Sequence, residues 1–321
     1  CFCGPCFGAG DVPANFGLSI RHSTRNFPNR DGSKPREGQM AAVALMDARS
    51  IAVSARRGGI ITPADEYAEK KTYSYVYDPS IYEKTVYDGV GRPKPEEKLI
   101  LGPNITDWPP QPELAENLLI EVASYITDEV TTTDELIPSG ETSSYRSNPL
   151  RLAEFALSRK DPGYVGRMKR IGKTGKDGLT ALLAPFGLSA ENTGFGGAVA
   201  ARKPGDGSAR EQAASCQRVL GGNANVAVEY ATKRYRSNLI NWGMLPFVLR
   251  DPADFEKFET GSLLYVPGVR ETVRSGAEEC VGYLLRDGER IPVALSLGRL
   301  TDAERDILLA GCLINYYGKD L

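Results

Sequence analysis

The chain has 321 residues, which at about 150 residues per domain indicates roughly two domains. Lysine and arginine total 39 and aspartate and glutamate total 41, so the net charge of −2 disfavours a broad nucleic-acid-binding or polybasic membrane surface. No segment approaches the roughly 20 consecutive apolar residues of a membrane-spanning helix. The first residue is Cys rather than Met and no signal-peptide pattern follows it, so we expect a piece of a longer, cytoplasmic protein.

The six cysteines fall into two groups. Three of them crowd into Cys1-Phe-Cys3-Gly-Pro-Cys6 at the start of the chain. A C-x-x-C pair is typical of a redox site or of two ligands to a metal or cluster, and the spacing alone leaves both open. The other three are scattered singly and are predicted to be small buried side chains: Cys216, Cys280 and Cys312.

The first predicted helix covers residues 47–59. Asp47 is suited to cap its N-terminus, arginines occupy its last turn and Gly58 follows. From residue 63 to residue 112 the composition shifts to tyrosine, proline, lysine and glutamate, which predicts an extended linker.

A compact pattern resumes near Leu118. Short apolar strands are predicted at residues 198–201, 226–230 and 263–266, alternating with helical stretches. Residues 281–295 predict a β-hairpin with Asp287-Gly288 in its turn. Residues 301–317 predict one closing helix, in which Thr301 and Glu304 form a capping box.

The stretch Gly205-Asp-Gly-Ser208-Ala-Arg210-Glu211 joins a predicted strand to a predicted helix. Ser208 and Glu211 fit a capping box, which is the purely structural interpretation. The same geometry has a functional interpretation, because a helix N-terminus offers free N–H groups to a carboxylate and Arg210 adds a charged fork. A serine at that place has its alkoxide stabilised and is suited to act as a base. The local sequence favours capping by about two to one and leaves both interpretations open.

Three further arginines occur in segments whose combined pattern indicates a functional site. Thr24-Arg25-Asn-Phe-Pro-Asn-Arg30 holds two in a turn-rich segment, and Thr132-Thr-Asp134 is followed twelve residues later by Arg146. Taken singly, each of these arginines is more often a solvated surface group, and Asp134 alone is suited to cap a turn.

Together these motifs resemble the aconitase superfamily. Cys3-Gly-Pro-Cys6 with the Arg25–Arg30 segment resembles its cluster-binding region, and Thr132-Thr-Asp134 with Arg146 is similar to its Thr-Thr-Asp-His segment and substrate arginine. Residues 207–211 resemble its Gly-Ser-Ser-Arg-Glu motif. Asn238-Leu-Ile-Asn-Trp-Gly-Met-Leu-Pro is similar to a further family segment. The motifs follow the family's order over residues 3–247, and the nearest pattern is that of bacterial aconitase-like hydratases.

The resemblance implies a role for each matching position. Cys3 and Cys6 would supply two of three thiolates to a [4Fe–4S] cluster that acts as a Lewis acid on the substrate hydroxyl. Ser208 would be the catalytic base that removes a proton α to a carboxylate, and Asp134 would join the catalytic hydrogen-bond network. The substrate carboxylates would be held by four arginines: Arg25, Arg30, Arg146 and Arg210.

The sequence departs from the family pattern in several places. Ala209 stands where a second serine is usual, Glu135 where histidine is usual and Thr24 where asparagine is usual. The family's third cluster cysteine and its histidine–carboxylate pairs have no counterpart, since His22 is the single histidine. The C-x-C-x-x-C spacing of Cys1 is not the family arrangement. We therefore expect this chain to be inactive alone.

The resemblance implies an α/β fold in three parts. Residues 1–64 would be the C-terminal part of an α/β/α cluster-binding domain, residues 65–115 a linker, and residues 116–321 a swivelling β/β/α domain. The function implied is that of a hydro-lyase acting on a hydroxy di- or tricarboxylic acid. The expected partners are that small-molecule substrate and N-terminal domains of the same protein, with no membrane and no nucleic acid. The alternative from another class is a non-catalytic regulatory or RNA-binding relative.

Overall fold

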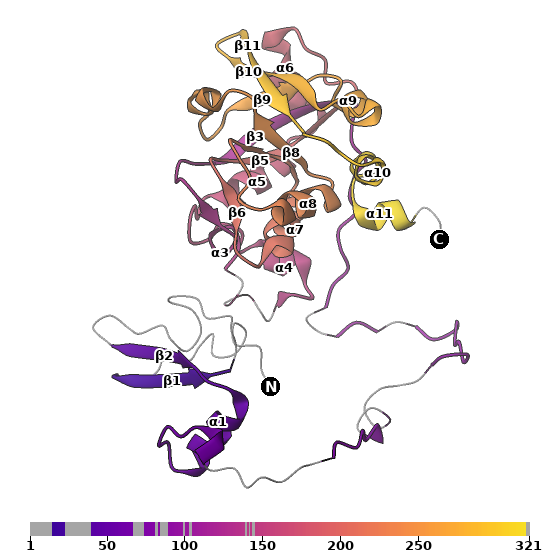
Figure 1. Ribbon diagram of the computed structural model, residues 1–321. Helices are drawn as coiled ribbons and strands as arrows, with labels where there is room; N and C mark the ends of the chain where they lie inside the picture. The colour runs from indigo at the N-terminus through magenta and orange to yellow at the C-terminus, as the bar shows by residue number, and fades with distance from the viewer. Residues whose placement is uncertain are drawn as a thin grey trace. The chain divides into compact units, whose positions relative to one another are not determined.

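The computed structural model describes residues 15–22, 40–66, 74–80, 83, 89–98, 100–102, 105–138, 140, 142 and 145–318. The chain divides into two compact units, residues 1–101 and residues 102–321, which we call unit 1 and unit 2. Figure 1 shows the elements of both. The three-part division expected from the sequence stays a prediction.

Unit 1 contains a small parallel sheet followed by a helix. Strand β1 (Gly17–Arg21) pairs in parallel with β2 (Ala41–Leu45). Helix α1 (Ala48–Arg56) begins where expected, because the Asp47 carboxylate accepts hydrogen bonds from the backbone N–H groups of Arg49 and Ser50. A short 3₁₀ turn, η3 (Ala64–Glu66), follows.

Unit 2 is built around a closed barrel with the strand order β10-β11-β8-β7-β5-β3-β9. Its parallel half is formed by β3 (Asn117–Ile126), β5 (Thr193–Ala201), β7 (Gly222–Ala227) and β8 (Leu245–Leu249). Its antiparallel half is formed by β9 (Leu263–Val266), β10 (Glu279–Arg286) and β11 (Glu289–Ser296). Outside the barrel, β4 (Thr131–Thr132) pairs in parallel with β6 (Pro204–Asp206).

Helices connect and cover these strands. In chain order they are α3 (Thr133–Leu136), α4 (Pro149–Ala153), α5 (Tyr164–Gly172), α6 (Lys176–Leu183) with η5 (Ala184–Phe186), α7 (Arg210–Val219), α8 (Lys233–Asn241), η6 (Pro252–Lys257), α9 (Val269–Ser275), α10 (Asp302–Ala310) and α11 (Leu313–Gly318). Helix α7 packs against α4 and α8, as Figure 1 shows.

Alternate residues of β3 contribute to three different hydrophobic clusters. On β3, Leu118, Ile120 and Val122 join a cluster that receives apolar side chains from every barrel strand. On the other face of β3, Leu119 joins a cluster with α6, and Ala123 joins a cluster formed with α3, α4, α5, α7 and α8. Successive side chains of a strand point to opposite faces. Because both faces of β3 are covered by other elements, both carry apolar side chains.

Several predicted elements agree with the structure. The predicted strand 263–266 is β9, the strand predicted at 198–201 is the end of β5, and the strand predicted at 226–230 overlaps the last residues of β7. The hairpin forms with Asp287 and Gly288 both at positive φ, 51° and 78°, as a type I′ turn requires.

The single closing helix predicted for residues 301–317 is divided in two. Its capping box is confirmed, since Thr301 and Glu304 bond reciprocally at the start of α10. The helix ends at Gly311, which takes a φ of 90°. Gly311 is the left-handed C-cap of α10, and a Cβ there would overlap the carbonyl of Pro112, so the position admits only glycine.

Candidate functional site

The loop between β6 and α7 passes close to α3. Gly205 and Gly207 have φ of 97° and 118°, values that side-chain-bearing residues rarely adopt. A Cβ at Gly207 would overlap the hydroxyl of Thr133, and the Ala209 N–H donates to that same hydroxyl at 3.3 Å. The Thr132-Thr-Asp134 segment and the Ser208 segment, more than seventy residues apart in the sequence, therefore lie against one another.

The capping role favoured for Ser208 by the local sequence is wrong. Helix α7 begins at Arg210 with Ala209 as N-cap, and no side chain caps it. The Glu211 carboxylate, which would complete a capping box, instead accepts a hydrogen bond from the indole N–H of Trp242 at 3.2 Å. Ser208 is left exposed at the start of the helix.

Ser208 opens into a solvent-facing pocket of ≈340 Å³ between α7 and α8. Its lining residues are Ser208, Arg210, Glu211, Lys233, Arg234, Ser237 and Asn238. Three of these side chains are cations and one is a carboxylate, so the pocket is net positive. The Nε of Arg210 is buried and has no hydrogen-bond partner in the described part of the chain. This combination suits an anionic ligand.

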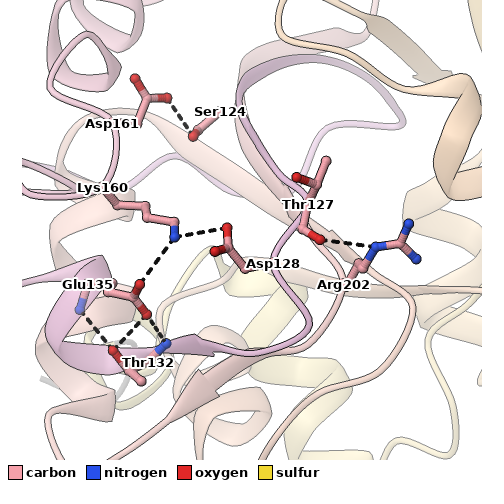
Figure 2. A network of polar contacts seen from close by, with 8 residues as sticks. All are labelled: Ser124, Thr127, Asp128, Thr132, Glu135, Lys160, Asp161 and Arg202. Carbon is pink, nitrogen blue, oxygen red and sulfur yellow. Dashed lines mark hydrogen bonds and ion pairs between the residues drawn. The ribbon is translucent and has the colours of Figure 1, made fainter.

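The site segment on α3 is held by its own capping box. The Thr132 hydroxyl accepts from the Glu135 N–H at 3.2 Å, and the Glu135 carboxylate accepts from the Thr132 N–H at 2.7 Å. Lys160 donates to Glu135 at 3.2 Å and pairs with Asp128 at 2.8 Å (Figure 2). The Thr-x-x-Glu pattern at residues 132–135 was available in the sequence as a signal for this cap.

These contacts move the titration of the groups involved. Burial raises the pKa of the Glu135 carboxyl, but hydrogen bonds from Thr132 and the ammonium of Lys160 outweigh it, so the pKa lies below its usual value. Hydrogen bonding to Lys160 likewise lowers the pKa of Asp128. The hydrogen bond to Asp128 is the main cause of the raised pKa of Lys160. Where the family pattern has histidine, this chain thus has a carboxylate in a local ion cluster.

The structure brings together part of the predicted site. Ser208 and Arg210 line one pocket. Asp134 lies on neighbouring α3 and pairs with Arg159 at 2.8 Å. Arg146 lies in the turn before α4 and is not among the residues that line the pocket. The remaining predicted site residues lie outside the described residues: Cys3, Cys6, Arg25 and Arg30.

Sequence reasoning missed the α8 wall of the pocket. The first turns of α8 contribute three lining residues: Lys233, Arg234 and Ser237. The Thr133 hydroxyl accepts the Ala209 N–H and so contacts the Ser208 loop. Lys233 and Arg234 lie side by side in the sequence, but nothing local relates them to Ser208, because only tertiary packing of α8 on α7 makes them neighbours.

The described cysteines do not fit a cluster site. Cys216 and Cys312 are buried in the core and Cys280 is partly buried, as predicted for small apolar side chains. Burial raises the pKa of the Cys216 thiol and raises that of Cys280 to about 11, which disfavours the thiolate that a metal requires. Within the ranges that the structure describes, no group of three or more metal-binding side chains was found. In the same ranges, no helix is long and apolar enough to cross a membrane.

A family model matches this part of the chain. Residues 197–252, which include the Ser208 loop, α7 and α8, match the family model of the aconitase C-terminal domain. The chain is 30% identical over 123 residues to the putative mitochondrial aconitate hydratase of Emericella nidulans, covering 38% of this chain and 15% of that protein. It is 30% identical over 124 residues to the mitochondrial homocitrate dehydratase of Saccharomyces cerevisiae, covering 37% of this chain and 16% of that protein.

A solved structure, the 3-isopropylmalate dehydratase of Methanocaldococcus jannaschii, aligns with a TM-score of 0.40 and 20% identity, covering 61% of this chain and 92% of that one. Over the matched residues the chain is similar to proteins of the aconitase superfamily, and residues 197–252 match the C-terminal domain of that family. The matches span about a sixth of the length of the curated relatives.

Proposed function

We propose that this chain carries the base-bearing part of a hydro-lyase that reversibly removes water from a hydroxy di- or tricarboxylic acid. The observation that supports this most is the shared pocket of Ser208 and Arg210, which is exposed, net positive and located in the segment that matches the family model. The names of the relatives, aconitate hydratase and homocitrate dehydratase, agree with substrates of this class.

In this proposal Arg210 holds a substrate carboxylate beside Ser208. The alkoxide form of Ser208 is stabilised by Arg210 and by the uncapped first turn of α7. The Ser208 oxygen takes the proton from the carbon α to the bound carboxylate. Loss of hydroxide from the neighbouring carbon then forms the double bond, and proton plus hydroxide account for the water removed.

The remaining expected roles are part of the proposal. Asp134 orders the hydrogen-bond network next to the Ser208 loop, and Arg25, Arg30 and Arg146 complete the carboxylate binding. Residues 116–321 act as a swivelling domain. Since the family's histidine–carboxylate pairs have no counterpart in these 321 residues, the chain alone is predicted to be inactive.

Binding of a [4Fe–4S] cluster by Cys3 and Cys6 is proposed from the sequence resemblance alone. Its test is the iron and sulfide content of the protein that contains this chain, after reconstitution without oxygen. The proposal expects equal iron and sulfide and a brown protein. A colourless, iron-free product contradicts it.

The test of the base is turnover by the same reconstituted protein with Ser208→Ala. Removal of a catalytic base is expected to lower kcat by about 10²–10⁴-fold. The matched control is Ser237→Ala, which removes a hydroxyl from the opposite wall of the same pocket and should retain most activity. Equal loss in both variants, or unchanged turnover in Ser208→Ala, contradicts the assignment.

A further inference from the structure

The α8 wall of the pocket carries two adjacent cations that the expected site does not include. We propose that Lys233 and Arg234 bind a second carboxylate of the ligand, so that the pocket selects di- and tricarboxylates over monocarboxylates. This inference rests on the proposed function, since it takes Arg210 as the site of the first carboxylate.

The charge of the pocket supports this role. Arg210, Lys233 and Arg234 line it together, and no ion pair of any of the three occurs among the described residues. The acidic residue closest in sequence to the start of α8, Glu229, is engaged by Lys203 at 2.9 Å. Three cations gathered in one pocket against a single carboxylate favour binding of an anion with several charges.

The one carboxylate that lines the pocket is restrained. Glu211 accepts the indole N–H of Trp242 at 3.2 Å. Trp242 is itself only 9% exposed and packs on Trp108 with ring centroids 4.4 Å apart. Because the indole cannot move without disturbing this packing, one Glu211 oxygen has a fixed partner other than the pocket cations.

The two walls are fixed relative to each other. Buried Tyr235, one residue after Arg234, receives hydrogen bonds from Gln217 of α7 at 2.9 Å and from Asn225 of β7 at 2.8 Å. The Thr232 hydroxyl caps α8 by accepting from the Tyr235 N–H. The first turn of α8 is thus tied to α7, which keeps the backbone of Lys233 and Arg234 at the same pocket as Arg210 before any ligand binds. Cations carried by two helices that are fixed to each other suit a molecule with more than one carboxylate.

The experiment is calorimetric titration of the 321-residue chain at low ionic strength with tricarballylate, succinate and acetate. These probes carry three, two and one carboxylates and no hydroxyl. The test variant is Lys233→Gln/Arg234→Gln. The charge-matched control is Lys173→Gln/Lys176→Gln, two exposed lysines that do not line the pocket.

We expect affinity to fall in the order tricarballylate, succinate, acetate. The test variant should weaken tricarballylate binding about tenfold and leave acetate nearly unchanged, because two exposed ion pairs are lost. The control should bind like the wild type. Equal weakening in both double variants, no weakening in the test variant, or no preference for the multiply charged probes overturns the inference.

A result that excludes the second carboxylate site can be told apart from a result that excludes the proposed function. Loss of turnover in Ser208→Ala, with tricarballylate affinity unchanged in Lys233→Gln/Arg234→Gln, would retain the base and remove the second carboxylate site.

Discussion

Gly207 determines where Ser208 can lie. Its φ of 118° turns the chain after β6, and its missing Cβ lets Thr133 approach closely enough for the Thr133 hydroxyl to accept the Ala209 N–H. Any larger residue would both strain this turn and separate the two segments of the site.

We expect Gly207→Ala to lower the free energy of unfolding by about 1–3 kcal/mol from backbone strain, with a further loss from the overlap with Thr133. The control is Gly221→Ala, where φ is 92° but a Cβ would meet nothing within 4 Å. Urea denaturation of both variants is the measurement. A smaller loss in Gly207→Ala than in Gly221→Ala would contradict the proposed contact.

Glu135 replaces the histidine of the family pattern with a group whose pKa is lowered in the folded state. A carboxyl with a lowered folded pKa stabilises the protein above its unfolded pKa, and this contribution disappears as the pH falls through the folded pKa. The unfolded reference is 4.5, so the change lies in the acidic range.

We therefore expect the stability difference between wild type and Glu135→Gln to be constant near neutral pH and to shrink as the pH falls below about 4.5. Denaturation curves at a series of pH values measure it. A difference that does not depend on pH would contradict the role assigned to the Thr132–Glu135–Lys160 cluster.

At the scale of elements, local signals predicted what depends on neighbouring residues. The Asp287-Gly288 turn and the Thr301–Glu304 cap each need only a few adjacent positions. The cap expected from Ser208 and Glu211 is absent because the helix starts one residue later than that box requires, and the Glu211 carboxylate bonds to Trp242, thirty-one residues away. The break at Gly311 had a local signal, since glycine is a common helix C-cap, and the close approach of Pro112 that excludes a side chain there is a tertiary contact.

The Trp242–Glu211 bond offers a test at this scale. Trp242→Phe removes the indole donor, so Glu211 becomes free to neutralise the pocket cations and tricarballylate binding should weaken. In a Glu211→Gln background the same substitution should have little further effect, because the competing charge is absent. Titrations of the two single variants and the double variant complete the cycle. Equal effects of Trp242→Phe in both backgrounds would contradict this account.

At the scale of the molecule, the sequence predicted an α/β protein but not the closed barrel. The β4–β6 pairing and the joining of β9 to β3 connect residues far apart in the chain, so no local pattern encodes them. The pocket has the same origin: Ser208 and Arg210 were recognisable from a motif, whereas Lys233 and Arg234 become part of it only through the packing of α8 on α7.

Arg218 holds distant parts of unit 2 together. It is 5% exposed, and its guanidinium donates to the carbonyls of Gly222, Pro112 and Gly311 and to the Asn223 side chain. Arg218→Met should lower the free energy of unfolding by about 2–4 kcal/mol, because these buried acceptors lose their donor.

The control for Arg218 is Arg274→Met, which breaks an exposed ion pair with Glu271 and should cost less than about 1 kcal/mol. Thermal denaturation of both variants measures the difference. Similar losses in the two variants would contradict the role assigned to Arg218.

The central claim is that the pocket between α7 and α8 presents a carboxylate-bearing carbon to Ser208. A crystal structure of the chain with tricarballylate tests it most directly. The account predicts one carboxylate on Arg210, another on Lys233 and Arg234, and the Ser208 oxygen facing a C–H carbon next to the first carboxylate. Tricarballylate bound with its carboxylates away from Arg210, or with Ser208 out of reach of every C–H carbon, would contradict it.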